Sequence, residues 1–418
     1  MTHPSFSNLL FGLPFLFLLL AQEKILLGSL PLYSLEIASI PVFGYALWRF
    51  LVSDEKLSSL FSADKLLSLG VFLALSGAAL SFFVNPFSLT GLGMLKSWFF
   101  FPAFLFFAGI SMRKELSAER LLIFWLLGTL FVAVAAFLGI REGIYTFDQR
   151  LAFPYSSPNF LAILLLSGIL IASAFGTRYF RTKKGLSWLF FLAALLLLVP
   201  FIETRSYGAW AALSGAFVWL LSSRSSASGL RKTLAAALLL AAVSTTAFFF
   251  SESGTGKWQS LVHFDERSSL SSREMIWKAS FAILGDSPFF GIGVGRFQET
   301  YLEYQRHFPP YLEWAVPEPH NLILAFWFGT GIIGLSGFLL VIGRSLFLLW
   351  RILPERKDLA SLALSLWGAL LLFGLLDTPY FRNDLAFLFW MLVLLSFLVQ
   401  QKLPLTEERT FVGEKKRG

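Results

Sequence analysis

The sequence contains no cysteine and few charged residues. Among 418 residues there are no cysteines and only four histidines, and the charged share is 14 %. Without cysteine, disulfide bonds and thiolate metal sites are excluded, and the redox compartment cannot be inferred. An ordinary soluble chain carries about a quarter charged residues, so this composition excludes a typical soluble globular protein.

Apolar and aromatic residues dominate instead. The hydrophobic share is 56 %, with 48 phenylalanines and 13 tryptophans, which is typical of a large lipid-facing surface. The net charge of +8 could indicate nucleic-acid binding. The basic residues, however, lie in short loops between apolar runs, as the positive-inside rule requires, so we expect membrane lipids and no nucleic acid as partners. The first apolar run, residues 9–21, lacks a basic leader and a cleavage site, so we interpret it as a retained span.

The apolar runs predict an all-α, polytopic membrane protein with about 12 transmembrane helices. A spanning helix needs roughly 20 apolar residues. The predicted spans are residues 8–22, 28–51, 66–84, 95–111, 120–140, 159–176, 186–202, 207–222, 233–251, 320–350, 359–376 and 384–400. The chain therefore divides into spans one to nine (1–251), one long polar and helical loop (252–319), spans ten to twelve (320–400) and a tail (401–418).

The basic residues of the loops predict the orientation. With the N-terminus inside, the segments assigned to the cytoplasm hold 22 lysines and arginines, and the short outer loops hold six. Translocation of basic residues is disfavoured, so both termini are expected in the cytoplasm. The protein is then expected in the bacterial inner membrane, with the long loop in the periplasm and the basic tail against anionic lipid.

Four groups of polar residues lie at the predicted outer ends of spans. They are Arg150 with Asn159 before the sixth span, residues 203–208 (ETRSYG) between the seventh and eighth, residues 272–277 (SREMIW) in the long loop, and residues 318–321 (EPHN) at the start of the tenth. An ionised side chain at membrane level costs a few kcal/mol unless it has a partner or water, so a simple bundle would not retain these groups.

Each arginine also has a structural interpretation. Arg205 can pair with Glu203, or it can reach the interface as an anchor. Arg273 can contact lipid phosphates from the start of an interfacial amphipathic helix.

The other polar residues have structural interpretations too. His320 and Asn159 each follow a proline and are typical of helix caps, and Asp377, before Pro379, is typical of a helix end. Glycines 291, 293 and 295 form a weak phosphate-loop signal that lacks the Lys-Ser/Thr ending of a nucleotide loop.

Taken together, the four groups predict an anion site. Arginine and histidine at one outer face, with no acidic partner to neutralise them, would form a positive pocket suited to a lipid-linked anion. No Asp-x-Asp pair occurs in an outer loop, so we expect neither a metal nor another cofactor. Arginine would then stabilise the leaving phosphate as a fixed planar donor.

The same groups resemble the O-antigen ligase/polymerase superfamily of bacterial membrane glycosyltransferases, most closely O-antigen ligase. The resemblance covers roughly residues 145–400, including the layout with a large loop before span ten, and it implies a GT-C-like fold. It rests on Arg150 with Pro158-Asn159, on residues 204–209 (TRSYGA), on residues 273–277 (REMIW) with Ser287-Pro288 and Gly291-Ile292-Gly293, and on His320-Asn321 with residues 331–334 (GIIG).

The resemblance implies an activity. A glycan on undecaprenyl diphosphate would be transferred in the periplasm to the lipid A core, with inversion and without metal or nucleotide. Arg205 and Arg273 would bind the diphosphate, and His320 would deprotonate the attacking hydroxyl, for which an imidazole titrating near pH 6.5 is suited. Arg150 and Asn159 would bind or shape the donor pocket.

Two further residues and several alternative functions complete the prediction. Glu318 and Tyr207 are our own candidates for orienting His320 and Arg205. Within the family, a polymerase would use a second lipid-linked repeat as acceptor, and a protein oligosaccharyltransferase would use a protein hydroxyl. From another class, a lipid or glycan transporter also suits 12 spans, although the halves show no evident symmetry and the ionisable groups gather at the surface.

Overall fold

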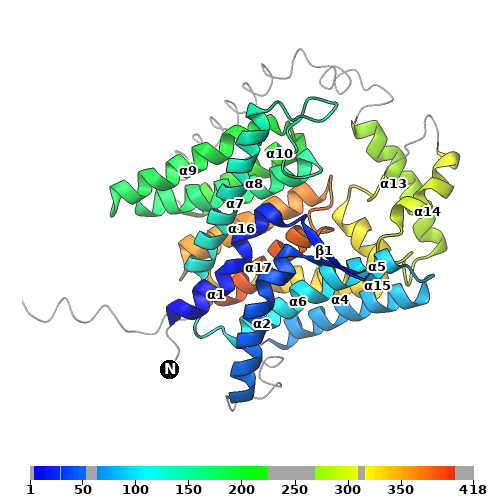
Figure 1. Cartoon of the computed structure of the whole chain (residues 1–418), viewed down its shortest axis with the longest axis horizontal. Coiled ribbons are helices and arrows are strands. Elements are labelled where there is room, and N and C mark those ends of the chain that lie inside the picture. Colours follow the sequence, from blue (N-terminus) through cyan, green and yellow to red (C-terminus); the bar gives the residue numbers. More distant parts are fainter. Residues whose placement is uncertain (1–3, 29, 53–63, 225–268, 309–315, 401–418) are drawn as a thin grey trace, which may run out of the picture.

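The computed structural model describes residues 4–28, 30–52, 64–224, 269–308 and 316–400, and this part of the chain is helical apart from one hairpin (Figure 1). The α-helices are α1 (Pro4–Leu16), α2 (Ser34–Val52), α4 (Lys65–Val84), α5 (Leu89–Met94), α6 (Phe101–Ser111), α7 (Ala118–Arg141), α8 (Pro158–Tyr179), α9 (Lys184–Glu203), α10 (Tyr207–Arg224), α13 (Ser269–Asp286), α14 (Phe297–Tyr304), α15 (Leu322–Ile352), α16 (Lys357–Gly374) and α17 (Asn383–Leu398). Short turns are η1 (Leu18–Leu20), the π-helix η2 (Leu95–Phe100) and η3 (Gln305–His307).

Eight of these helical segments are long and apolar enough to cross a membrane. They are Ser34–Val52, Lys65–Val84, Leu89–Ser111, Ala118–Arg141, Pro158–Tyr179, Lys184–Glu203, Leu322–Ile352 and Lys357–Gly374. Each coincides with a predicted span, so a multi-pass membrane protein is confirmed, with eight spans in the described part rather than the 12 expected.

Three of the remaining four predicted spans do not meet that test, and the fourth lies outside the described residues. Residues 8–22 and 384–400 correspond to the shorter apolar helices Phe6–Leu20 and Asn383–Leu398, and residues 207–222 correspond to α10. Residues 233–251 and the tail 401–418 lie outside the described residues. The second predicted span also starts too early, because β1 (Lys24–Leu27) and β2 (Leu30–Tyr33) form an antiparallel hairpin before α2.

α15 is bent by a break at Gly331, whose backbone lies at φ 63° and ψ −175°. The 21 residues from 332 to 352 span about 31 Å at 1.5 Å per residue, close to the roughly 30 Å hydrocarbon core of a bilayer. The break separates them from residues 322–330, although the apolar segment long enough to cross a membrane is the whole of Leu322–Ile352. We call residues 322–330 the outer segment of α15.

Small residues let α15 pack closely along α4. A Cβ on Gly77 would lie 2.2 Å from the backbone nitrogen of Gly334, and one on Gly337 would lie 2.2 Å from that of Ala74. Side chains at these positions would force the helices apart, so glycine is what permits this contact. The seam between α4 and α15 therefore gives the outer segment a rigid base.

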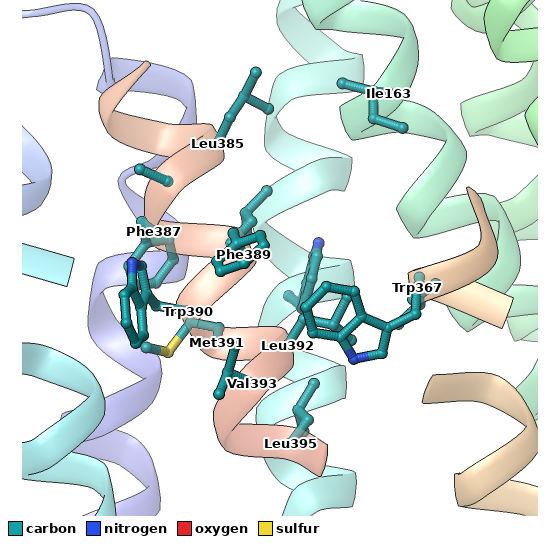
Figure 2. Packing of buried hydrophobic residues seen from close by; sticks show 14 of the residues in the cluster. Ile163, Trp367, Leu385, Phe387, Phe389, Trp390, Met391, Leu392, Val393 and Leu395 are labelled. Carbon is teal, nitrogen blue, oxygen red and sulfur yellow. The ribbon is translucent and has the colours of Figure 1, made fainter. Parts of the chain in front are cut away.

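α17 forms the centre of the bundle, where it contacts α6, α15 and α16. Of its residues, all but Phe397 are buried. Figure 2 shows aromatic side chains of α17 reaching toward neighbouring helices, and Phe389 meets Trp367 of α16 edge to face with ring centroids 5.3 Å apart. A helix that is apolar all round and enclosed by protein needs no lipid-facing stripe.

Charged residues gather at the two ends of the bundle. At one end, Arg49 pairs with Glu115 (2.8 Å), and Arg344 pairs with Asp64 (2.8 Å). At the opposite end, which holds the start of α8, α10, α15 and α17, lie the polar groups singled out in the sequence. We call this the site end, and α13 and α14 lie beside it (Figure 1).

Candidate active site at the site end

Asn159 joins three separate loops. It lies in the first turn of α8, just after Pro158. Its Oδ1 accepts hydrogen bonds from Arg150 Nη2 (2.6 Å) and Ser206 Oγ (2.9 Å), and its Nδ2 donates to Asp377 Oδ2 (2.6 Å). Because the amide uses both its acceptor and its donor, Asn159 is a connecting residue in a network. The interpretation of Asn159 as a helix cap is wrong, because the cap is Ser157, whose Oγ accepts from the Asn159 N–H (3.3 Å).

Arg150 is fixed by its neighbours. Its Nε donates to the carbonyl of Thr204 (2.9 Å), and its Nη1 lies 3.7 Å from Asp148. Burial lowers the pKa of the Arg150 guanidinium, while Asp148 and Asp377 act in the opposite direction. Since arginine titrates far above neutral pH, the group stays cationic and adds positive charge to the site.

Asp377 is the residue that the sequence analysis missed. It is 4 % exposed, its Oδ1 accepts from the backbone N–H of Thr378 (2.9 Å), and that same oxygen lies 3.5 Å from His320 Nδ1. Burial acts to raise the pKa of this carboxyl, but the imidazole of His320, the Thr378 N–H and the charge of Arg273 outweigh it, and the net shift is downward. Asp377 is therefore a carboxylate at neutral pH.

The expectation that no acidic group neutralises the histidine and arginines is wrong. Asp377 lies at the end of α16, 57 residues after His320 in the chain, and only the antiparallel packing of α15 and α16 brings the two together. Its signal in the sequence was an acidic residue at the end of an apolar run, which also fits a simple helix end.

His320 faces Asp377 from the residue pair that precedes α15. Its side chain is 33 % exposed, so it can be reached from outside. The helix cap is Asn321, whose Oδ1 accepts from the N–H groups of Ile323 (3.0 Å) and Leu324 (3.1 Å). The interpretation of His320 as a cap is therefore wrong, and its imidazole remains available for chemistry.

Arg273 reaches the same place from α13. Its Nε donates to the carbonyl of Leu376 (2.8 Å), the residue immediately before Asp377. Burial lowers the pKa of the guanidinium, and the charge of Asp377 counteracts this. The contact brings Arg273 beside the Asp377 carboxylate although 103 residues separate it from Leu376 in the chain.

Arg205 and Tyr207 lie in the tight connection between α9 and α10. Arg205 sits between Thr204, whose carbonyl binds Arg150, and Ser206, whose hydroxyl binds Asn159. Tyr207 begins α10 and lies close enough to Arg150 for the two side chains to interact electrostatically. The connection thus presents Arg205 at the edge of the network, and Tyr207 belongs with Arg150 as well.

Glu318 contacts a different partner from the one expected. Its carboxylate accepts a hydrogen bond from the hydroxyl of Thr378. Burial and the nearby Asp377 raise the pKa of the Glu318 carboxyl well above its usual range. The carboxylate that faces His320 is Asp377, so Glu318 supports the Asp377 loop instead of orienting the imidazole.

A buried cation ties the Asp377 loop to the Asn159 loop. Arg382 forms a two-pronged ion pair with Asp384, at 2.9 and 3.0 Å. Its guanidinium carbon lies 4.5 Å from the ring centre of Tyr155 and 4.6 Å from that of Phe160. This cation–π sandwich fixes the residues on either side of the network.

Backbone strain is concentrated at the site. In the described part of the chain, the non-glycine residues with positive φ are Gln149 (56°), Arg205 (46°) and His320 (50°). Each is a site residue or the neighbour of one. This conformation costs on the order of 1–3 kcal/mol for a non-glycine residue, and it persists only where the surroundings impose it.

Taken together, the site combines arginines from separate parts of the chain with one carboxylate–imidazole pair. Arg150 and Arg273 lie near Asp377, and a second carboxylate, Asp148, lies next to Arg150. Guanidinium groups gathered in this way favour an anionic ligand. Within the residues that the structure describes, no group of three or more metal-ligating side chains occurs. The arrangement can bind a phosphate through guanidinium groups while an imidazole accepts a proton.

The bundle and its site define a multi-pass membrane protein with a cluster of arginines at one end. Residues 192–339 match the sequence model of the family described as O-antigen ligase. The matched segment contains Arg205, Tyr207, Arg273, Glu318 and His320, and it confirms the resemblance inferred from the motifs there. Over this part of the chain, the protein is similar to the O-antigen ligase family. No curated protein shows a significant match to this chain.

Proposed function

We propose that this protein transfers a glycan from undecaprenyl diphosphate to the lipid A core on the periplasmic face of the inner membrane. The observation that carries the proposal is the convergence of Arg150, Arg273, Asp377 and His320 from separate parts of the chain at one end of an apolar bundle. The site lies at the start of α15, at one end of an apolar helix long enough to cross a membrane. A diphosphate anchored in that leaflet would lie at this level.

The arginines act on the donor. When the bond between the anomeric carbon and the diphosphate oxygen breaks, the oxygen takes both bonding electrons and negative charge develops on it. Arg205 and Arg273, supported by Arg150, stabilise this charge. Because Arg273 Nε is bound to the carbonyl of Leu376, the plane of its guanidinium is set before the substrate arrives. Such preorganisation lowers the barrier without a cost at the moment of reaction.

His320 acts on the acceptor. The acceptor hydroxyl attacks the anomeric carbon from the side opposite the diphosphate, so the configuration inverts, and the hydroxyl proton passes to His320 Nε2. The imidazolium that results is stabilised by Asp377 Oδ1, which lies 3.5 Å from Nδ1. Atoms and charge balance: one C–O bond forms, one breaks, and the proton and the diphosphate charge are each held by a protein group.

Both substrates are lipids confined to one leaflet. They can meet only by lateral diffusion, and holding them in register removes much of the entropic cost of a two-body reaction. The positive-inside distribution supports a periplasmic position for the site end.

The test is a reconstituted transfer assay. The purified protein receives a lipid-linked glycan together with lipid A-core or with a second lipid-linked repeat. Extension of lipid A-core supports the ligase assignment. Extension of the second repeat alone would replace it with a polymerase, and transfer to neither would refute the proposal.

Single substitutions test the assigned roles. Arg205→Ala, Arg273→Ala and His320→Ala are each expected to abolish transfer without affecting expression or insertion. Arg141→Ala is the matched control, because Arg141 also lies at the site end, at the close of α7, with a side chain 79 % exposed. If His320→Ala retained near-normal turnover, the assignment of the base would be wrong.

A further inference from the structure

The break in α15 is filled by a segment of the preceding loop. In a regular helix the N–H of Ile332 would donate to the carbonyl of Phe328. Here the Ile332 N–H donates to Phe289 O (3.0 Å), and Phe328 O accepts from the Ile292 N–H (3.0 Å). The two groups of one missing helical hydrogen bond are thus both satisfied by the loop, and we call residues 289–292 with 328–332 the glycine clasp.

Two glycines make the clasp possible. A Cβ on Gly331, where φ is 63°, would lie 2.3 Å from the carbonyl oxygen of Phe289. A Cβ on Gly291, where φ is 66°, would lie 2.3 Å from the carbonyl oxygen of Phe328. At either position a Cβ would therefore clash with the backbone of the other segment of the clasp. Each glycine also has a backbone conformation that residues with side chains rarely adopt. Gly291 is one of the three glycines that gave the weak phosphate-loop signal in the sequence.

Further contacts tie the clasp to its surroundings. Trp327 Nε1 donates to the carbonyl of Pro288 (2.7 Å), and Asn85 Nδ2, just past the end of α4, donates to Gly291 O (3.4 Å). On the other side of the break, residues 332–352 of α15 pack closely against α4. The clasp therefore lies next to the closely packed contact between α4 and α15.

Two parts of the candidate site are connected to the glycine clasp. The outer segment of α15 leads from Gly331 back to His320, and α13 ends at Asp286, a few residues before the clasp, with Arg273 on its first turns. Trp277 Nε1 of α13 donates to the carbonyl of Pro319 (3.0 Å), which joins the two parts again near the site.

We infer that the glycine clasp is a positioning element that holds Arg273 and His320 at a fixed separation for the proposed transfer. This inference rests on the proposed function, and it assigns the glycines a role through the two side chains rather than any contact with substrate. Opening the clasp would let α13 shift against α15. A displacement near 1 Å at a reacting group can cost on the order of a hundredfold in rate.

The chain offers sharp variants and matched controls. Gly331→Ala and Gly291→Ala are expected to lower turnover at least tenfold, with a smaller change in KM for the lipid-linked donor. Gly343→Ala in the same helix and Gly285→Ala in α13 are controls, because nothing lies within 4 Å of a Cβ at either position. They should keep turnover within about twofold of the native protein.

A distance measurement distinguishes a change in the relative position of α13 and α15 from a general loss of structure. Since the native sequence has no cysteine, Gly285→Cys and Gly343→Cys can carry two spin labels without background. We expect a narrow distance distribution in the native background and a broadened or shifted one with Gly331→Ala. Normal turnover in Gly331→Ala, or lost turnover with an unchanged distance, would overturn the inference.

A milder variant covers the case in which Gly331→Ala does not fold. Trp327→Phe keeps the aromatic packing and removes only the hydrogen bond to Pro288, and it should lower turnover about threefold and broaden the distance. Unchanged turnover and distance would contradict the inference. If the native protein catalyses no transfer, the proposed function fails, while the spin-label distances still decide whether the clasp holds α13.

Discussion

Replacing Asp377 with asparagine tests the centre of the network. The substitution keeps the shape of the side chain and the acceptor for the Thr378 N–H (2.9 Å). It removes the negative charge 3.5 Å from His320 Nδ1, and it opposes an amide N–H₂ to the Nδ2 donor of Asn159, now bound at 2.6 Å. We expect Asp377→Asn to fold and to lose most of its transfer activity.

The expected loss of rate follows from the distance between His320 and Asp377. Two opposite charges about 4 Å apart interact by about 4 kcal/mol at an effective dielectric of 20. The His320 side chain is one-third exposed, so solvent screening reduces this to about 2 kcal/mol. If this attraction stabilises the imidazolium formed in the transition state, its loss slows transfer by about thirtyfold. If the asparagine amide is flipped, so that its N–H₂ donates to Nδ1, that nitrogen becomes the acceptor, the ring proton moves to Nε2 and the loss is larger.

The assay is single-turnover transfer from a lipid-linked glycan at saturating acceptor. Asp148→Asn is the matched control, because Asp148 lies 3.7 Å from Arg150 at the same end of the bundle. We expect that control to lose at most a few-fold in rate. Near-native turnover in Asp377→Asn, or an equal loss in both variants, would refute the idea that Asp377 stabilises the imidazolium of His320.

Four further outcomes are expected. Arg273→Lys should lower turnover tenfold or more, since an ammonium cannot keep the bond to Leu376 O and present a planar fork, whereas insertion should be normal in a membrane-fraction blot. Because the pKa of Glu318 is higher in the folded protein than in the unfolded chain, its carboxyl contributes stability that is fully present below the unfolded-state pKa of about 4.3. This contribution is lost as the pH rises through the folded-state pKa of Glu318. The melting temperature should therefore fall less steeply with rising pH in Glu318→Gln than in the native protein. Gly77→Leu should destabilise the fold by about 1–3 kcal/mol or more in denaturant melts by separating α4 from α15, whereas Gly44→Leu, with open space around it, should not. A chelator should leave transfer undiminished, and a sharp loss would restore a metal mechanism.

Hydropathy predicted the spans well where the chain is uniformly apolar. The predicted span 66–84 and the helix Lys65–Val84 nearly coincide, because a helix that crosses the bilayer needs about 20 consecutive apolar residues. The hairpin at residues 24–33 was missed for the same reason. Its strands are as apolar as a helix, and nothing in hydropathy reports the turn at Gly28, where φ is 63°.

The candidate site was predictable only in part. Arg150, Arg273 and His320 stand out because ionisable residues are costly in an apolar chain, whatever their neighbours are. Asp377 gains its meaning from a partner 218 residues away, Asn159, and from the packing that brings the two loops together. Such long-range pairing leaves no local pattern, and the same sequence position also fits an ordinary helix end.

The position of α17 has a consequence for how the protein is made. Ribosomal synthesis delivers the N-terminal helices first, and the helix at the centre of the bundle arrives last of those described. Until it enters, α6, α15 and α16 surround a slot that only lipid tails can fill. The bundle therefore cannot reach its final packing during translation, and a chain truncated before Asn383 would lack both its core and the anchor for the loop that carries Asp377.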